Sequence, residues 1–185
     1  MASTISAGTT SGTALNMSGD TTGNLAFQTS AGTYTQTMPN ATGTVMVSGN
    51  MPAFSAYQSS TQSLTTNTTT KLQFQTKEFD TANCFDSTTN YRFTPTVAGY
   101  YQVSGGVATI SAGGVCQLSV YKNGSSFKVL QRIDPTAVAC YGSCLIYFNG
   151  TTDYIELYYY ISAITQNTYT GAANTYFQAS MVRAA

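Results

Sequence analysis

Few side chains in this 185-residue chain could carry out chemistry, and histidine is absent from the sequence. Histidine is the usual general base near neutral pH and the commonest metal ligand, so both roles lack their ordinary residue. Seven acidic residues remain, and two carboxylates flanking one bond could cleave a glycoside. Asp80 and Asp86 share one polar stretch, but acids in such loops are ordinarily solvated. We therefore expect a protein that is not an enzyme.

The four cysteines could indicate a metal site or disulfides. No Cys-x-x-Cys pair occurs and no histidine accompanies them, so a zinc site is disfavoured. Cys140 and Cys144 are four residues apart, which on a regular strand separates them by about 13 Å along one face. A disulfide requires Cα atoms within about 7 Å, so that pair cannot bridge on such a strand. Buried thiols in a reducing compartment are the favoured interpretation, and a bridge involving Cys84 or Cys116 stays open.

The elements that must position these residues centre on residues 91–106. Phe93-Thr-Pro95 ends one extended run, and Pro95 belongs at a strand margin because proline cannot donate to a ladder. Gly99 opens the next run and suits a tight turn with positive φ. The period of two then places Tyr101 and Val103 on one face, with Gly105 and Val107. The pattern predicts strand, corner and strand in an all-β sandwich.

Further strands are predicted on both sides of this centre. Asn123-Gly124 is the strongest hairpin signal, because a type I′ turn requires positive φ at both positions. Asn149-Gly150 marks a second turn. The other predicted strands cover residues 53–57, 71–77 with Leu72 and Phe74 on one face, 115–121, 127–131, 140–148, 154–161 and 176–181, where Phe177, Ala179 and Met181 face the core.

One of these strands carries large side chains on both faces. Ile155, Leu157, Tyr159 and Ile161 alternate with Tyr154, Glu156, Tyr158 and Tyr160. A solvated sheet face is normally polar, and tyrosine is favoured at interfaces because it has an apolar body and a polar tip. Tyr154, Tyr158 and Tyr160 are therefore candidate subunit-interface residues, with a merely bulky outer face as the alternative.

Residues 51–185 resemble the globular heads of the complement q-subcomponent and its tumour-necrosis-factor-like relatives. The resemblance rests on Phe79-Asp80, Phe85-Asp86, Phe93-Thr-Pro95, Gly99-x-Tyr101-x-Val103, Val120-Tyr-Lys-Asn-Gly124, Asp153-Tyr-Ile155-Glu-Leu157 and Tyr176-Phe-Gln-Ala-Ser-Met181. The chain departs from the family at Val103, where an aromatic is usual, and lacks the tryptophan often found in the 153–157 strand. The resemblance implies an antiparallel jelly-roll β-sandwich head that assembles as a homotrimer.

The same resemblance makes calcium the metal to consider, because some members bind it with loop carboxylates near the trimer tip. Asp80, Asp86 and Asp134 are the available oxygen ligands, but no Asp-x-Asp pattern accompanies them. Ordinary loop acids are the favoured interpretation, so we expect no cofactor.

Residues 1–50 differ in composition from the rest, since Asp20 is their only charged residue. Short pieces that could form strands recur between glycines, at 13–17, 24–29, 33–38 and 44–47. Each offers too few apolar side chains to be stable alone, so the strands would need to wind with other copies or lie on a larger body. Gly23-x-Leu25-x-Phe27 and Pro39-Asn-Ala-Thr-Gly43-Thr-Val45 resemble N-terminal stretches of tailed-bacteriophage virion proteins. A β-rich stem or anchor is expected, with a flexible linker as the alternative.

Composition excludes several classes of function. The net charge is zero with no basic run, so nucleic-acid binding is not expected. No apolar segment is long enough to span a bilayer, and residues 1–8 lack the pattern of a signal peptide. We therefore expect no membrane insertion and synthesis in a host cytoplasm.

Together these observations favour a structural protein of a bacteriophage virion, either a short homotrimeric fibre or a capsid-decoration protein. Residues 1–50 would contact other capsid or tail proteins, and the head at 51–185 would point outward. A host-surface glycan or receptor is a further expected partner of the head. The alternative is a lectin-like module that binds carbohydrate or a cell surface, free of any particle.

Overall fold

The computed structural model describes residues 26–29, 32–37, 46, 49, 51–111, 114–134 and 138–185. The chain divides into two compact units, Met1–Thr44 and Val45–Ala185. Within the described residues no helix is long and apolar enough to cross a membrane.

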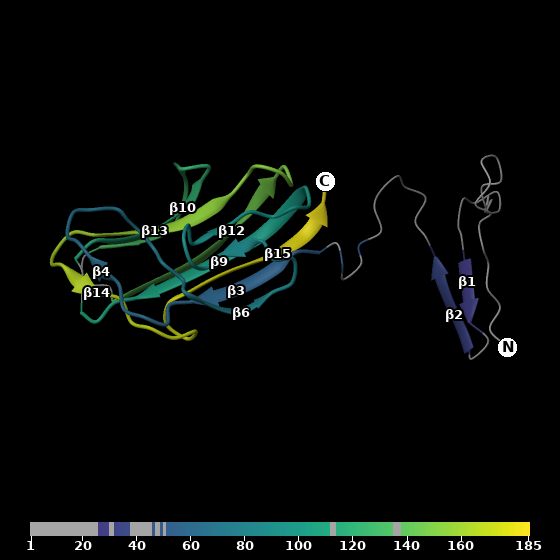
Figure 1. Cartoon of the computed structure of the whole chain (residues 1–185), viewed down its shortest axis with the longest axis horizontal. Helices are drawn as coiled ribbons and strands as arrows, with labels where there is room; N and C mark the ends of the chain where they lie inside the picture. Colours follow the sequence, from purple (N-terminus) through teal and green to yellow (C-terminus); the bar gives the residue numbers. More distant parts are fainter. Residues whose placement is uncertain are drawn as a thin grey trace. The chain divides into compact units, whose positions relative to one another are not determined.

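The described residues of the first unit form an antiparallel pair of strands, β1 (Ala26–Thr29) and β2 (Gly32–Thr37) (Figure 1). Ala26 lies opposite Thr37, and Phe27 lies opposite Gln36. These strands overlap the predicted ones at 24–29 and 33–38, whereas the predicted strand at 13–17 lies outside the described residues. The assignment of residues 1–50 as an anchor or stem stays a prediction.

The described residues of the second unit form thirteen strands, most of them short. They are β3 (Ala53–Tyr57), β4 (Ser63–Leu64), β5 (Thr70–Lys71), β6 (Thr76–Asp80), β7 (Phe85–Asp86), β8 (Arg92–Phe93), β9 (Gly99–Ala108), β10 (Cys116–Lys122), β11 (Ser125–Ile133), β12 (Ala139–Phe148), β13 (Ile155–Ile161), β14 (Gln166–Asn167) and β15 (Tyr176–Ala184).

These strands form two main sheets in which every pairing is antiparallel. The five-stranded sheet has the order β12-β9-β15-β3-β6. The six-stranded sheet has the order β11-β10-β13-β8-β7, with β5 paired to β13, and β14 pairs separately with β4. The unit is an antiparallel jelly-roll β-sandwich, so the predicted fold class is confirmed (Figure 1).

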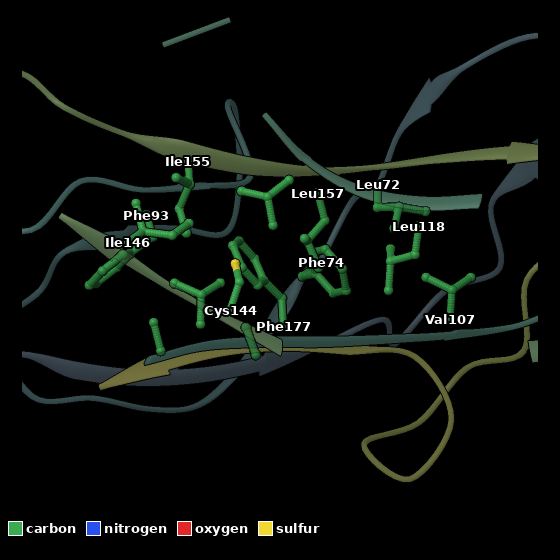
Figure 2. Packing of buried hydrophobic residues seen from close by; sticks show 14 of the residues in the cluster. Leu72, Phe74, Phe93, Val107, Leu118, Cys144, Ile146, Ile155, Leu157 and Phe177 are labelled. Atoms are coloured by element: carbon green, nitrogen blue, oxygen red, sulfur yellow. The ribbon is translucent and has the colours of Figure 1, made fainter. Parts of the chain in front are cut away.

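The hydrophobic core lies between the two sheets. Figure 2 shows Ile155, Leu157 and Leu118 of one sheet facing Cys144 and Phe177 of the other. A cluster of phenylalanines fills one region, with the ring centroid of Phe54 4.5 Å from that of Phe85 and 4.6 Å from that of Phe93. Burying one such side chain stabilises the fold by about 1.5–3 kcal/mol, so this phenylalanine cluster adds substantially to the free energy of unfolding.

The predicted strand at 71–77 is wrong, because this segment passes from one sheet to the other. Only Thr70–Lys71 pairs with β13, and β6 begins at Thr76. Between them the Leu72 amide donates to the Leu157 carbonyl (2.9 Å), and the Gln73 amide donates to Oε1 of Gln62 (3.0 Å). Leu72 and Phe74 are both buried.

The two predicted turns have different outcomes. Asn123 and Gly124 have φ values of 53° and 79°, and they join β10 and β11 as the predicted hairpin. Asn149-Gly150 connects β12 and β13, which lie in different sheets. There the Asn149 side-chain oxygen accepts hydrogen bonds from the amides of Thr151, Thr152 and Asp153.

Gly99 is the first residue of β9 rather than part of a tight turn, and it lies opposite Phe148. A Cβ at this position would overlap the backbone carbonyl oxygen of Arg183 in β15. Glycine is therefore required by the close approach of two strands.

Candidate functional site

The core motif residues all lie inside the sandwich. Phe93 contacts Tyr101 edge to face, with ring centroids 5.7 Å apart, and the Tyr101 hydroxyl donates to the Val97 carbonyl (2.8 Å). Burial raises the pKa of Tyr101, so its hydroxyl stays protonated. The buried members of the motif are Phe93, Pro95, Gly99, Tyr101, Val103 and Phe177. They hold the two sheets together and are not available to a ligand.

The three tyrosines predicted at an interface lie on or beside the outer face of the six-stranded sheet, where each has a partner in its own chain. Arg92 lies over the ring of Tyr154, with its guanidinium carbon 4.5 Å from the ring centroid. Tyr158 stacks on Tyr121 at 3.9 Å between centroids. The Tyr160 hydroxyl donates to the Asn67 side-chain oxygen (3.0 Å). All three are half-buried, and their role at an interface stays a prediction.

Glu156 lies on the same face and is almost fully buried, which the sequence pattern did not indicate. Its carboxylate forms an ion pair with Lys71 of β5 (3.1 Å). The Tyr158 hydroxyl also donates to this carboxylate (3.4 Å), so Glu156 is buried with partners from its own chain.

The outer face of the five-stranded sheet is different, because large side chains there are left uncovered. Tyr100 of β9 is 41% exposed, and its ring lies 5.4 Å from that of Tyr147 of β12, which is 44% exposed. Leu145 in β12 and Phe79 in β6 are half exposed, at 50% and 51%. We define the aromatic face by the large outward side chains of this sheet, namely Phe79, Tyr100, Tyr141, Leu145, Tyr147 and Tyr176.

Sequence reasoning missed the aromatic face, although a signal for it was present. Tyr141, Leu145 and Tyr147 occupy odd-numbered positions of β12, whereas the buried Cys140, Cys144 and Ile146 occupy even-numbered ones. The alternation shows that two faces exist, but it does not show that β12 lies beside β9. That pairing brings Tyr141 and Tyr147 into one surface with Tyr100.

A hollow of about 280 Å³ lies within the five-stranded sheet's outer surface. Its floor combines Gln102 of β9 with Gln178 and Ser180 of β15, and Phe79 forms one side. The remaining lining residues are Ala53, Phe54, Ser104 and Ala179.

A second pocket, of about 300 Å³, lies at the β7–β8 edge of the six-stranded sheet and is predominantly polar in composition. Its lining residues are Asn83, Cys84, Phe85, Asp86, Asn90, Arg92 and Thr94. Asp86 and Arg92 lie opposite each other in the β7–β8 pair. No carboxylate of the described residues lies within 4.0 Å of the Arg92 guanidinium.

The carboxylates considered for calcium do not come together as a ligand set. Asp80 is almost buried, and its oxygens accept hydrogen bonds from the amides of Cys84 (2.9 Å) and Phe85 (3.0 Å) and from Lys77 (3.0 Å). Burial alone would raise the pKa of Asp80, but these donors outweigh it and the net pKa is lowered.

Asp86 is also engaged by its own loop. Its carboxylate accepts hydrogen bonds from the backbone amides of Thr88, Thr89 and Asn90 at 2.9–3.0 Å. These donors, that of Thr89 first, hold the pKa of Asp86 well below its usual range. Asp134 is exposed beyond the end of β11, and no three His, Cys, Asp or Glu side chains of the described residues are grouped to hold a metal.

All four cysteines are buried. Cys84, Cys140 and Cys144 are free thiols, and the Cys116 thiol lies against the Gly114 carbonyl (3.6 Å). Burial raises the pKa of Cys140 to about 11, which suppresses its nucleophilic thiolate at neutral pH.

Comparison with known proteins places this geometry in one fold. No protein-family model and no curated protein sequence matches the chain. The globular domain of zebrafish complement 1qA protein superposes with a TM-score of 0.54 at 16% identity, covering 72% of this chain and 99% of that one. Murine APRIL superposes with a TM-score of 0.57 at 10% identity, covering 71% of this chain and 99% of that one. PRD1 vertex protein P5 superposes with a TM-score of 0.55 at 19% identity, covering 71% of this chain and 97% of that one. At such identities the likeness concerns the fold, which is the jelly roll of the complement-q and tumour-necrosis-factor type.

Proposed function

We propose that this chain is a non-enzymatic structural protein of a bacteriophage virion, either a short homotrimeric fibre or a capsid-decoration protein. Residues 51–185 form its outward head, which contacts the host surface. Residues 1–50 dock on capsid or tail proteins or braid into a stem. The protein is made in the host cytoplasm and acts on the particle.

The observation that carries this proposal is the aromatic face. A sheet face in contact with water is normally polar, and contiguous exposed apolar patches mark interaction sites. Tyrosine and leucine side chains there are 41–50% exposed on neighbouring strands β9 and β12. A cyclic homotrimer would cover one such face on each of its subunits and close without leaving a free interface. We therefore assign the aromatic face to self-association, with Tyr154, Tyr158 and Tyr160 as the alternative interface.

The chemistry of the charged residues supports a non-enzymatic role. Asp80 and Asp86 are saturated by hydrogen bonds from their own loops, and their pKa values are lowered. A general acid at neutral pH requires a raised pKa instead. Lys71, Lys77 and Lys122 are each held in an ion pair.

The virion setting is supported by residues 1–50 and by the shared fold. Residues 1–50 are almost uncharged and rich in Thr, Ser and Gly, and in this they resemble N-terminal stretches of tailed-bacteriophage virion proteins. The described strands of this segment are β1 and β2. The head shares its fold with a vertex protein, P5 of PRD1.

A truncation tests the docking half of this proposal. Residues 1–44 are removed and the chain is kept from Val45, because Met46 packs against the core of the head. Purified particles lacking the protein are incubated with the full-length or the truncated chain and then sedimented. We expect only the full-length chain to sediment with the particles. Equal attachment of both would overturn the anchoring role of residues 1–50.

The second candidate function is a lectin-like module free of any particle. The polar pocket beside Arg92 favours it, because that pocket presents hydrogen-bonding groups away from the aromatic face. Saturable binding of carbohydrate without any attachment to particles would support this candidate over the virion role.

A further inference from the structure

The pocket beside Arg92 has the dimensions and the groups of a small-ligand site. Its volume of about 300 Å³ is at the lower end of the range for ligand pockets, so it suits one ring-sized unit. Polar side chains converge on it from the 83–86 segment and from the 90–94 segment.

Several of these polar groups lack a hydrogen-bond or ion-pair partner among the described residues. In the described part of the chain, the side chains of Asn83 and Thr94 make no hydrogen bond, and Arg92 makes no ion pair. Asn90 donates its side-chain amide to Asp86 (2.9 Å), which leaves its own carbonyl oxygen to accept. The pocket therefore offers donors from Asn83 and Arg92 together with acceptors from Thr94 and Asn90.

The groups that line the pocket are held in place before any ligand arrives. Asp86 fixes the Thr88–Asn90 turn through three backbone amides. The ring of Tyr154 supports the Arg92 guanidinium at 4.5 Å, so the planar donors have a fixed orientation. Such preorganisation reduces the entropic cost of binding.

Charge and shape select the class of ligand. Asp86 carries a full negative charge opposite the positive Arg92, so the pocket has little net charge to attract an anion. Phe85 also lines the pocket, but its side chain is only 3% exposed and its ring is stacked on Phe54 in the core, so the groups that a ligand can reach are polar. A neutral, ring-sized molecule whose several hydroxyls both donate and accept, as in a sugar, satisfies these features together.

We infer that this pocket binds one neutral sugar unit of a carbohydrate chain, with Arg92, Asn83, Asn90 and Thr94 hydrogen-bonding its hydroxyls. This inference goes beyond the structural role proposed above and deepens the second candidate function, on whose pocket it rests. It is independent of the aromatic face, because the pocket is lined by β7, β8 and the segments beside them.

The test is an NMR titration of the ¹⁵N-labelled full-length protein with the methyl glycosides of glucose, galactose and mannose. We expect at least one glycoside to produce saturable shifts confined to the amides of residues 83–94, with a millimolar dissociation constant. Arg92→Gln should weaken this binding about tenfold, because it removes hydrogen bonds from a charged donor. Arg132→Gln is the matched control, since Arg132 lies on β11 outside the pocket, and should leave binding unchanged.

The corresponding glucuronide separates neutral from anionic recognition. We expect it to bind no tighter than the glucoside, because Asp86 balances Arg92. Tighter binding of the glucuronide that is lost in Arg92→Gln would overturn the neutral-sugar assignment. Absence of saturable shifts with every glycoside, well above millimolar concentration, would overturn the site itself. The native mass of the same sample is measured in parallel. A sample that binds no glycoside can then still be shown to be a trimer or a single chain, so the two proposals fail separately.

Discussion

Tyr100 of β9 and Tyr147 of β12 lie directly opposite each other across the strand pair, with ring centroids 5.4 Å apart and both rings exposed. Leu145 and Tyr141 lie on the same outward face of β12, where Ser143 and, on β9, Gln102 and Ser104 separate Tyr141 from this pair. The tyrosines on the opposite sheet, Tyr154, Tyr158 and Tyr160, are also paired within their own chain, but they are less exposed. Because of this difference in exposure, we place the proposed subunit contact on the five-stranded sheet.

The aromatic face can be tested with a single charge. Tyr147→Glu should weaken self-association by about 2 kcal/mol or more, because it removes an aromatic anchor and places a carboxylate in a desolvated contact. Sedimentation velocity over a range of protein concentrations measures the effect. Tyr169→Glu is the control, since Tyr169 is similarly exposed at 49% but follows β14 outside the aromatic face. Equal weakening by the control would remove the assignment.

The tyrosines of the six-stranded sheet give the opposite expectation. Tyr160→Ala removes the hydroxyl that donates to Asn67, so the free energy of unfolding should fall by at least about 0.5–1.5 kcal/mol. Urea unfolding measures this change, and light scattering should give an unchanged native mass. A clear fall in mass would instead support Tyr154, Tyr158 and Tyr160 as the interface.

Gly99 should be sensitive to the smallest enlargement. Gly99→Ala places a Cβ against the Arg183 carbonyl oxygen, which belongs to the backbone of β15 and cannot rotate away. We expect a loss of about 1–3 kcal/mol in the free energy of unfolding, the usual cost of overpacking. Gly49→Ala is matched to it, since no atom lies within 4 Å of the added Cβ. Chemical denaturation of the two variants should separate them, and similar stability would contradict the close-approach argument.

Acid should destabilise the head partly through Asp86. Its pKa is lower in the folded chain than the ordinary value of 3.8, so the unfolded chain takes up the proton first as the pH falls. The stabilisation is therefore fully present above that ordinary value and is lost progressively as the pH drops below it. The urea concentration at the unfolding midpoint, measured from neutral pH to strong acid, should therefore decrease as the pH drops below that value.

Asp86→Asn provides the comparison for the acid transition. The variant should be less stable at neutral pH and should show a shallower fall in acid, because the titrating group is gone. Asp134→Asn, at an exposed position beyond β11, should retain the wild-type acid profile. An unchanged profile in Asp86→Asn would show that other carboxylates control the acid limit.

Local signals in the sequence were sufficient for much of the fold. The Asn123-Gly124 turn and the alternation in 176–181 depend on neighbouring residues, and both features agree with the structure. Residues 71–77 also alternate, but tertiary contacts with Gln62 and Leu157 divide that stretch between two sheets. Periodicity identifies buried faces, as for Leu72 and Phe74, but it carries no information on which sheet a strand joins.

The candidate surfaces depended still more on long-range pairing. Glu156 was expected among outward polar residues, yet Lys71, 85 positions earlier in the chain, covers it. The aromatic face arises only when β9 and β12 pair. The polar pocket likewise requires β7 and β8 to pair, which brings the 83–86 and 90–94 segments together. None of these arrangements follows from the spacing of residues along one strand.

The central claim is that this head self-associates as a trimer, and the native mass of the full-length protein tests it most directly. Light scattering coupled to size exclusion gives that mass independently of molecular shape. We expect a value near three times the 19.6 kDa of one chain, falling towards one chain in Tyr147→Glu. A wild-type mass of one chain at every concentration would contradict the account and leave the aromatic face without its proposed partner.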